Sequence, residues 1–568
     1  MNLSEETQAY VERLIEPNGR PKILLLDAAT TAVLSLATTQ SALLKNDVFL
    51  IDKVTNPSRQ KMRHLDCVAF LRPDSDSIAA LVDELRVPKY GQYTLVFTNL
   101  VRKSQLERLA EADDHEVVSR VQEMFMDWRK INNDVFSAGL DSALDNPIWA
   151  ESPKVWDAEA LQTSVETVFA LLASLRWSRP IVRFDSNSGM SKKFASQLVH
   201  ELDMHKSVLP AKPANDLSTS PPQMIVLDRL NDPITPLISH WTYQAMVDEL
   251  IGITNNRVDL SAAPEVPPSH REIVLAQDQD AFFNESMYLN FGDLGAAVRE
   301  YVQQYSMRTK TSEQLETVAD IKKFVDGLPE FRKLQDNTTK HVSLVGELSR
   351  LVSSQHLLAV SEVEQSLACN ENHAGDLQNL QQLVVADAIP APLKYRLVAL
   401  YALRYRNHPH NATEQLIQTL GANFPGYDDL ERSVRNLVQI YTSTCPNFPQ
   451  EDLFNQGSIF MRAQQGLKGL RGVENVYTQH KSLLESVLAQ LVRNRLPREK
   501  YPYLQSTVTN VEYEPTKIIL FIIGGATFEE ARIVGEFNRA NPEYEVVLGG
   551  TGILSAAKFQ EALSLVRF

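Results

Sequence analysis

Two aspartates directly follow apolar runs of the kind that form buried strands. The segments "MIVLD" and "KILLLD" each read as a strand of a parallel sheet, and they end on Asp228 and Asp27. α/β enzymes place catalytic groups just past the carboxyl ends of such strands. A phosphotransferase with an aspartate nucleophile needs a second acid two residues further on, which protonates the leaving group. Leu230 and Ala29 occupy those two positions, so the spacing argues against phosphotransfer.

The segment around Asp228 is better explained as a turn. In "DRLNDPITP", Asp232 and Thr235 each precede a proline, Pro233 and Pro236. A residue before proline is pushed out of the α region, so the chain must turn here. The carboxylates of Asp228 and Asp232 can accept hydrogen bonds from backbone N–H groups of the turn. We predict a structural turn. The core residues of the helix that follows are expected to be Trp241, Tyr243 and Met246.

A glycine pair near the end of the sequence could bind phosphate. "KIILFIIGG" reads as a strand that ends on Gly524 and Gly525, and a helix begins near Thr527. No P-loop lysine follows, and no GxGxxG spacing is present. Glu530 fits a capping box with Thr527, and acids in the first turn of a helix repel anions. A tight turn explains the glycines adequately, and nucleotide binding stays open as an alternative.

Metal and thiol chemistry find little support. "HELDMH" places His200 and His205 five residues apart, not four as in HExxH, which rotates them off a shared helix face. The three cysteines, Cys67, Cys369 and Cys445, form no CxxC pair. We therefore predict reduced thiols, no metal site and no cofactor.

Composition excludes several classes of partner. Of 568 residues, 56 are basic and 71 are acidic, which gives a formal charge of −15. Such a chain has no excess of cations to neutralise nucleic-acid phosphates or an anionic membrane. The N-terminal segment lacks the apolar core of a signal peptide, and the longest apolar run, "IILFII", is far shorter than the roughly 20 residues of a membrane helix. We expect a soluble intracellular protein that inserts no segment into a membrane.

Apolar runs alternate with amphipathic helices in two parts of the chain, which predicts βαβ units and parallel sheets. In the first part we expect strands at 22–27, 47–51, 66–71 and 93–98, with helices up to residue 45 and at 74–86 and 103–112. In the second part we expect a helix at 159–177, a strand at 180–184, a helix from 190 and a strand at 224–228.

After about Thr242 the pattern becomes helical. Helices are expected at 284–305, 312–326, 329–352, 376–386, 391–406, 427–443 and 476–495. Strands return only at 517–525 and 544–550, and two strands do not form a stable sheet alone. We therefore predict that they complete the sheet begun at 180–228, so that this domain is discontinuous.

The stretch "MIVLDRLNDPITPLISHWTYQAMVDELIGI" resembles the signature of the Sec1/Munc18-like (SM) family of regulators of SNARE-driven membrane fusion. Further blocks resemble the same family in the same order along essentially the whole chain, and the detail is closest to its endosomal branch. Those blocks include 22–52, 71–99, 104–114, 287–295, 342–352, 361–369, 466–480, 501–504 and 521–532.

The resemblance implies an arch-shaped three-domain fold, α/β with parallel sheets in domains 1 and 2 plus a large all-helical insertion. The implied domains are 1–130 (domain 1), 131–245 with 476–568 (domain 2), 246–355 (domain 3a) and 356–475 (domain 3b). The implied function is non-catalytic. It consists of binding a syntaxin-class SNARE and chaperoning or templating SNARE complex assembly in endosomal and trans-Golgi traffic.

Two SNARE-binding surfaces follow from the resemblance. The first is a pocket on domain 1 for the N-terminal peptide of the syntaxin, with Leu106 as its key residue. Its other members would be Leu109, Val117, Val121 and Glu123, the last as a partner for a basic peptide side chain. Helix periodicity alone would instead turn most of the apolar members toward the core of domain 1.

The second implied surface is the arch cavity, which would hold SNARE and regulatory helices of the syntaxin. Asp27 matches a cavity-facing acid of some relatives, although Ala32 replaces the basic residue that accompanies it. A helical hairpin of domain 3a would bend or extend around Pro329, and contact of an R-SNARE with domain 3a stays open. Alternatively, Pro329 simply separates two helices.

The resemblance further implies a cytoplasmic protein that associates peripherally with endosomal or trans-Golgi membranes through its SNARE partners. We expect a monomer that binds no nucleic acid. Two other hypotheses are kept: a nucleotide-dependent enzyme that uses Asp27, Asp228 or Gly524, and a helical scaffold or tether without SNARE specificity.

Overall fold

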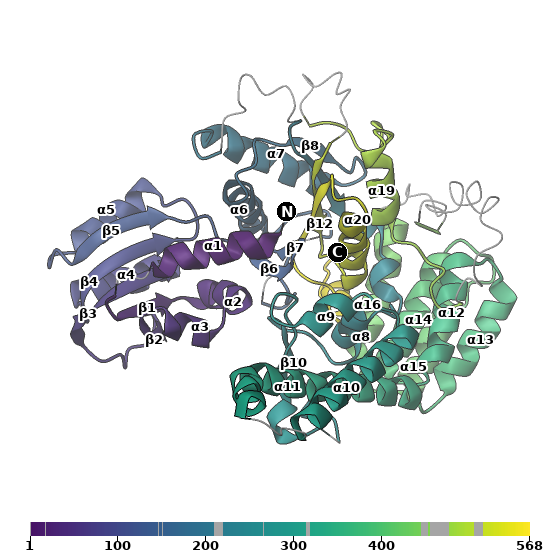
Figure 1. Ribbon diagram of the computed structural model, residues 1–568. Coiled ribbons are helices and arrows are strands. Elements are labelled where there is room, and N and C mark those ends of the chain that lie inside the picture. Colours follow the sequence, from purple (N-terminus) through teal and green to yellow (C-terminus); the bar gives the residue numbers. More distant parts are fainter. Residues whose placement is uncertain are drawn as a thin grey trace.

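The computed structural model describes residues 2–16, 19–145, 147–149, 152–209, 220–264, 266–313, 318–444, 453–454, 476–504 and 515–568. Within these ranges the side chains of 308–313, 318–333 and 443–444 are not described. Two α/β units and a helical body make up the molecule (Figure 1). The predicted combination of parallel sheets with a large helical insertion is confirmed.

The first sheet is parallel and has the strand order β2-β1-β3-β4-β5. Its strands are β1 (Lys22–Leu26), β2 (Val48–Lys53), β3 (Met62–Leu71), β4 (Tyr90–Phe97) and β5 (Val118–Glu123). The core on one face includes residues of α4 (Ser75–Arg86) and α5 (Lys103–Ala112). The core on the other face includes residues of α1 (Leu3–Ile15), α2 (Ala28–Ala37) and α3 (Gln40–Lys45).

The second sheet joins segments from distant parts of the chain, in the order β6-β7-β13-β12-β9-β8. Its strands are β6 (Arg129–Asn132), β7 (Val135–Ser137), β8 (Ile181–Phe184), β9 (Gln223–Asp228), β12 (Lys517–Ile523) and β13 (Glu545–Gly550). β12 pairs in parallel with β9, so that Ile519 lies opposite Met224. The prediction that the last two strands complete this sheet is therefore confirmed.

Helices cover both faces of the second sheet. Residues of α6 (Ala158–Ser174) and α7 (Gly189–Met204) share one core with the sheet. Residues of α19 (Leu483–Val492) and α20 (Phe528–Ala540) share the other. Such burial on both faces explains why these strands read as continuous apolar runs and not as alternating patterns.

The helical body differs from the prediction in three ways. Its helices are α8 (Tyr243–Leu250), α9 (Ala281–Ser286), α10 (Phe291–Glu313), α11 (Val318–Ser354), α12 (Leu357–Cys369), α13 (His373–Val385), α14 (Ala391–Arg404), α15 (Thr413–Asn423) and α16 (Asp428–Gln439). The predicted helix at 284–305 is divided between α9 and α10. The two helices predicted around Pro329 are one continuous helix, α11, and α12 and α15 were not predicted.

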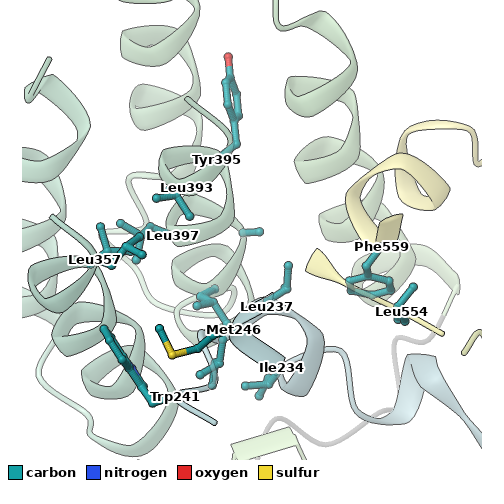
Figure 2. Packing of buried hydrophobic residues seen from close by; sticks show 14 of the residues in the cluster. Ile234, Leu237, Trp241, Met246, Leu357, Leu393, Tyr395, Leu397, Leu554 and Phe559 are labelled. Atoms are coloured by element: carbon teal, nitrogen blue, oxygen red, sulfur yellow. The ribbon is translucent and has the colours of Figure 1, made fainter. Parts of the chain in front are cut away.

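The turn after β9 lies in the core of the helical body. Figure 2 shows Ile234, Leu237, Trp241 and Met246 packed among residues of α12 and α14. Leu554, which lies two residues before α21 (Ala556–Ser564), and Phe559 within that helix belong to the same cluster. The signature stretch that follows β9 is therefore the place where the second sheet and the helical body are joined.

Candidate functional site

The carboxylates after β9 are engaged by the surrounding chain. Asp228 accepts hydrogen bonds from Ser188 Oγ at 2.6 Å and from Leu230 N at 3.0 Å. Asp232 accepts from Thr235 N at 3.1 Å and from Leu483 N, the first amide of α19, at 3.1 Å. These contacts are those of carboxylates that organise a turn and link it to the start of α19.

Arg229 connects this turn to the glycine pair after β12. Its Nη2 donates to Gly525 O at 2.9 Å and to Glu530 Oε2 at 2.6 Å, and the side chain is almost wholly buried. A Cβ atom at Gly524, whose φ is +95°, would lie 2.6 Å from Arg229 Cβ. The close approach of Arg229 therefore requires glycine at this position.

The first turn of α20 is capped by its own residues. Glu530 Oε2 accepts from Thr527 N at 2.9 Å, and Thr527 Oγ1 accepts from Glu530 N at 3.3 Å, as the predicted capping box requires. The carboxylate of Glu530 thus stands where a phosphate would have to bind. This arrangement gives no support to nucleotide binding at the glycine pair.

Asp27 is buried within the first α/β unit, so its predicted exposure to a cavity is corrected. Its side chain caps α2 by accepting from Thr30 N at 2.7 Å. It also accepts from Arg72 N at 2.6 Å and from Ser77 Oγ at 3.0 Å. Burial raises the pKa of the Asp27 carboxyl, although these hydrogen bonds oppose that shift. Asp27 holds together the carboxyl ends of β1 and β3.

The segment matched to the peptide pocket forms α5 and the edge strand β5. Asp113 shapes the turn between them, because its two carboxylate oxygens accept from Val117 N at 2.9 Å and Val118 N at 3.0 Å. Val121 pairs with Leu95, whose side chain belongs to the core that includes α5. Since paired residues of a parallel sheet share a face, Val121 and, two residues on, Glu123 lie on the α5 side.

Of the five predicted pocket residues, three are exposed on this side and one is half-buried. Leu106 on α5 and Val121 on β5 are 39% and 45% exposed, and Glu123 is exposed as well. Glu123 Oε1 already accepts from Val101 N at 2.8 Å, which ties the end of β5 to the start of α5. Val117 is half-buried against the core. We call Leu106, Val117, Val121 and Glu123 the α5/β5 surface.

Leu109 does not belong to the α5/β5 surface, and its assignment is corrected. It is 4% exposed and lies in the core between α5 and the sheet. Leu106 and Leu109 are three residues apart, but the helix turns the first outward and the second inward. The interpretation from helix periodicity therefore holds for Leu109.

The backbone around Pro329 is helical, because α11 runs from Val318 to Ser354. The predicted interruption of the helix at Pro329 is therefore wrong. The side chain of Pro329 lies outside the described residues, and its role as a hinge stays a prediction. A proline inside a helix removes one backbone hydrogen bond, which weakens α11 locally.

The residues after the turn make three long-range contacts that the sequence did not predict. Trp241 Nε1 donates to Ser361 Oγ of α12 at 2.9 Å. The hydroxyl of Tyr243 lies 2.8 Å from His341 Nδ1 of α11. Gln244 exchanges two side-chain hydrogen bonds of 3.0 Å with Asn132 of β6. Consecutive large polar and aromatic residues in "WTYQ" are the only signal that could have suggested this junction.

The described part of the chain contains neither a candidate metal site nor a candidate membrane-spanning helix. No group of three or more His, Cys, Asp or Glu side chains among the described residues is arranged to hold a metal ion. Within the same ranges, no helix combines the length and apolar character needed to cross a bilayer.

Comparison with known proteins places the chain in a family. The sequence pattern described as the Sec1 family matches residues 22–562. The protein named vacuolar protein sorting-associated protein 45 (Vps45) from Schizosaccharomyces pombe is 41% identical over 563 residues, which cover 98% of each chain. The human protein of the same name is 38% identical over 564 residues, which cover 99% of this chain and 96% of the human protein.

Solved structures agree with the sequence comparison. A structure of the SM protein Vps45 in complex with the Qa SNARE Tlg2 matches with a TM-score of 0.89 at 44% identity and covers 99% of this chain and 98% of that chain. The Unc18 chain of the Unc18–syntaxin 1 complex from Monosiga brevicollis matches with a TM-score of 0.80 at 18% identity, covers 100% of both chains and shows the fold alone. The arch-shaped SM fold and the resemblance predicted from the sequence are both confirmed: the chain belongs to the Sec1 family.

Proposed function

We propose that this protein is an SM-type regulator of vesicle fusion that binds a syntaxin-class SNARE and chaperones or templates SNARE complex assembly. The observation that carries the proposal is similarity over nearly the whole chain to proteins named Vps45, one of which was solved in complex with the Qa SNARE Tlg2. The same similarity supports a role in endosomal and trans-Golgi traffic, with peripheral membrane association through the SNARE partner.

The α5/β5 surface is our candidate for the binding site of the SNARE N-terminal peptide. Leu106 on α5 and Val121 on β5 offer exposed apolar area on the same side of the first sheet. An apolar peptide side chain would bury both residues, and Glu123 would attract a basic one. The net charge of −15 also favours a basic peptide over an acidic one.

The helical segments of the SNARE need a second surface, for which we propose the hairpin of α10 and α11. These helices lie side by side and belong to the implied domain 3a (Figure 1). The division into domains 1, 2, 3a and 3b at the boundaries given above is part of this proposal, and so is contact of an R-SNARE with the hairpin. The function needs no catalytic group, in keeping with the internal engagement of Asp27, Asp228 and Glu530.

Fluorescence anisotropy of a labelled N-terminal peptide from an endosomal Qa-SNARE tests the proposal. We expect saturable binding to the wild type and at least about tenfold weaker binding to Leu106→Arg, because the substitution removes apolar contact area and adds a charge. Leu358→Arg is the matched control, since Leu358 on α12 has a similar exposed fraction of 46%.

The outcomes separate the hypotheses. Equal weakening by both arginine variants would show that the effect is not specific to the α5/β5 surface. Unchanged binding to Leu106→Arg would place the peptide elsewhere on the molecule. A wild-type protein that binds neither this peptide nor the complete cytosolic part of the SNARE would contradict the proposed function and favour a scaffold without SNARE specificity.

A further inference from the structure

A buried chain of polar side chains joins α11 to two neighbouring helices. His341 of α11 lies between Tyr243 of α8 and Asp280, the residue that precedes α9. Its Nδ1 is 2.8 Å from the Tyr243 hydroxyl, and its Nε2 is 2.9 Å from Asp280 Oδ2. The three residues are 0%, 0% and 3% exposed, so water does not compete for these hydrogen bonds. We call them the Tyr243–His341–Asp280 relay.

The chemistry of the relay fixes the direction of each hydrogen bond. Burial raises the pKa of Asp280, but the hydrogen bond with His341 and the ion pair with Lys340 outweigh it and hold the pKa well below its usual range. The Asp280 carboxylate is therefore ionised and accepts from His341 Nε2. Burial lowers the pKa of His341 despite Asp280, which favours a neutral ring. Nδ1 then accepts a hydrogen bond from the Tyr243 hydroxyl.

Asp280 connects the relay to further elements. Its Oδ1 accepts from Phe283 N at 3.0 Å and so caps α9. Lys340 of α11 forms an ion pair with the same carboxylate. The Phe282 ring lies 4.6 Å from the His341 ring and 4.6 Å from the Tyr301 ring of α10, measured between ring centres. Residues of α8, α9, α10 and α11 thus meet around one imidazole.

The relay lies far enough along α11 that a small change in helix direction there would move the distant end of the helix substantially. The buried face of the helix continues from His341 to Leu344, Leu348 and Val352, which are apolar. In the other direction α11 extends back to Val318, which at 1.5 Å per residue is roughly 35 Å. A change of about 5° in the direction of the helix at His341 would move its far end by about 3 Å. Apolar contacts alone tolerate such a change better than directional hydrogen bonds do.

We propose that Tyr243, His341 and Asp280 are positioning residues that set the direction in which the α10–α11 hairpin leaves the helical body, and through it the fit of a bound SNARE helix. The last part rests on the proposed function, whereas the positioning of α11 does not. Gln244, next to Tyr243, is hydrogen-bonded to Asn132 of the second sheet. The relay therefore also fixes the direction of the hairpin relative to that sheet.

The test compares two substitutions that each remove one buried hydroxyl. Tyr243→Phe breaks the relay at one end and keeps the ring. Tyr405→Phe is the matched control, because the buried Tyr405 hydroxyl donates to Asp376 on α13, away from α11. Hydrogen exchange of the full-length proteins is followed by mass spectrometry. We expect about tenfold faster exchange in residues 334–348 for Tyr243→Phe, unchanged exchange in β1 and β12, and no change in α11 for Tyr405→Phe.

His341→Gln and His341→Leu extend the test. The glutamine amide can still donate to Asp280 although it cannot hold Tyr243 in the same geometry, so we expect it to protect α11 better than leucine does. Exchange in residues 334–348 that is unchanged in all three variants would overturn the proposal. Faster exchange throughout the molecule would overturn it too, because it would show a role in general stability.

Binding then tests the functional part. We expect Tyr243→Phe to weaken binding of the complete cytosolic part of a Qa-SNARE at least about fivefold while the affinity for its N-terminal peptide is unchanged. Equal loss for both probes, or no loss for either, would contradict a role of the relay in SNARE fit. If the wild type binds neither probe, the proposed function fails, but the exchange experiment still decides whether the relay positions α11.

Discussion

Gln244 and Asn132 form a reciprocal pair of amide hydrogen bonds, each 3.0 Å long, between the first turn of α8 and the edge strand β6. Both side chains are buried, so neither can turn to water if the other is removed. The pair therefore links α8 directly to the second sheet.

The amide pair predicts strongly coupled mutants. Gln244→Ala leaves two polar atoms of Asn132 without that partner, and each unsatisfied buried group costs about 1–3 kcal/mol. Asn132→Ala has the mirror effect. We expect the double variant to unfold at a higher temperature than the sum of the two single effects predicts, because no amide is then left alone. Circular dichroism during heating measures this, and strictly additive effects would contradict the pairing.

The corrected position of Leu109 makes a second prediction, about stability. Leu109→Ala opens a cavity between α5 and the first sheet, which costs about 2–5 kcal/mol. Leu106→Ala removes an exposed side chain from the same helix and should change the free energy of unfolding by no more than about 0.5 kcal/mol. Urea unfolding of the two variants and the wild type provides the measurement. A large loss of stability from Leu106→Ala would mean that this residue faces the core, against the proposed peptide surface.

The sequence predicted those parts of the fold that depend on burial along the chain. β9 and β12 are continuous apolar runs, and their pairing followed from the need of two late strands for a sheet. β5 was missed because it is an edge strand with mostly exposed residues, so its apolar content is low. α11 was divided wrongly at Pro329, because a local helix-breaking signal was given more weight than the helix that continues on both sides.

The contacts of the junction after β9 lie beyond any local pattern. Tyr243 was predicted to be a core residue, and it is buried, but its partner His341 lies 98 residues away. Trp241 and Ser361 are 120 residues apart. Such partners depend on how α8, α11 and α12 pack, which neither periodicity nor spacing contains. The burial of Leu109, in contrast, could be predicted from local sequence, since helix periodicity already favoured the core.

The glycine after β12 makes a third prediction. Gly524→Ala places a Cβ atom 2.6 Å from Arg229 Cβ at a φ of +95°, so it combines backbone strain with a steric clash. Gly252→Ala is the control, because Gly252 has a φ of +100° and its Cβ would meet nothing within 4 Å. We expect about 1–2 kcal/mol of destabilisation for the control and about 1–3 kcal/mol more for Gly524→Ala. Equal unfolding temperatures of the two variants would show that the Arg229 side chain can move away from a Cβ at position 524 without loss of stability.

The last prediction concerns pH and the buried Asp185, which lies just past the end of β8. Burial, reinforced by the neighbouring charge of Asp228, raises the pKa of Asp185 to about 6. The unfolded chain releases this proton near pH 3.9. The folded state therefore binds more protons between about pH 4 and pH 6. The stability that this group contributes is present below pH 4 and is lost as the pH rises through 6.

Asp185→Asn removes the titration and so isolates its effect. The free energy of unfolding of the variant, relative to the wild type, should rise between pH 4 and pH 7 by up to about 3 kcal/mol, since two pKa units correspond to that energy. Asp259→Asn is the control of opposite sign, because hydrogen bonds from Ser261 lower the pKa of the exposed Asp259. The free energy of unfolding of Asp259→Asn, relative to the wild type, should fall as the pH rises toward about 4. Urea unfolding at pH 4.5, 5.5 and 7 measures the difference for Asp185→Asn, and urea unfolding below about pH 4 measures the difference for Asp259→Asn. A pH-independent difference for Asp185→Asn would show that Asp185 is ionised throughout, and that its contacts with Asn187 and Asn231 offset the cost of its burial.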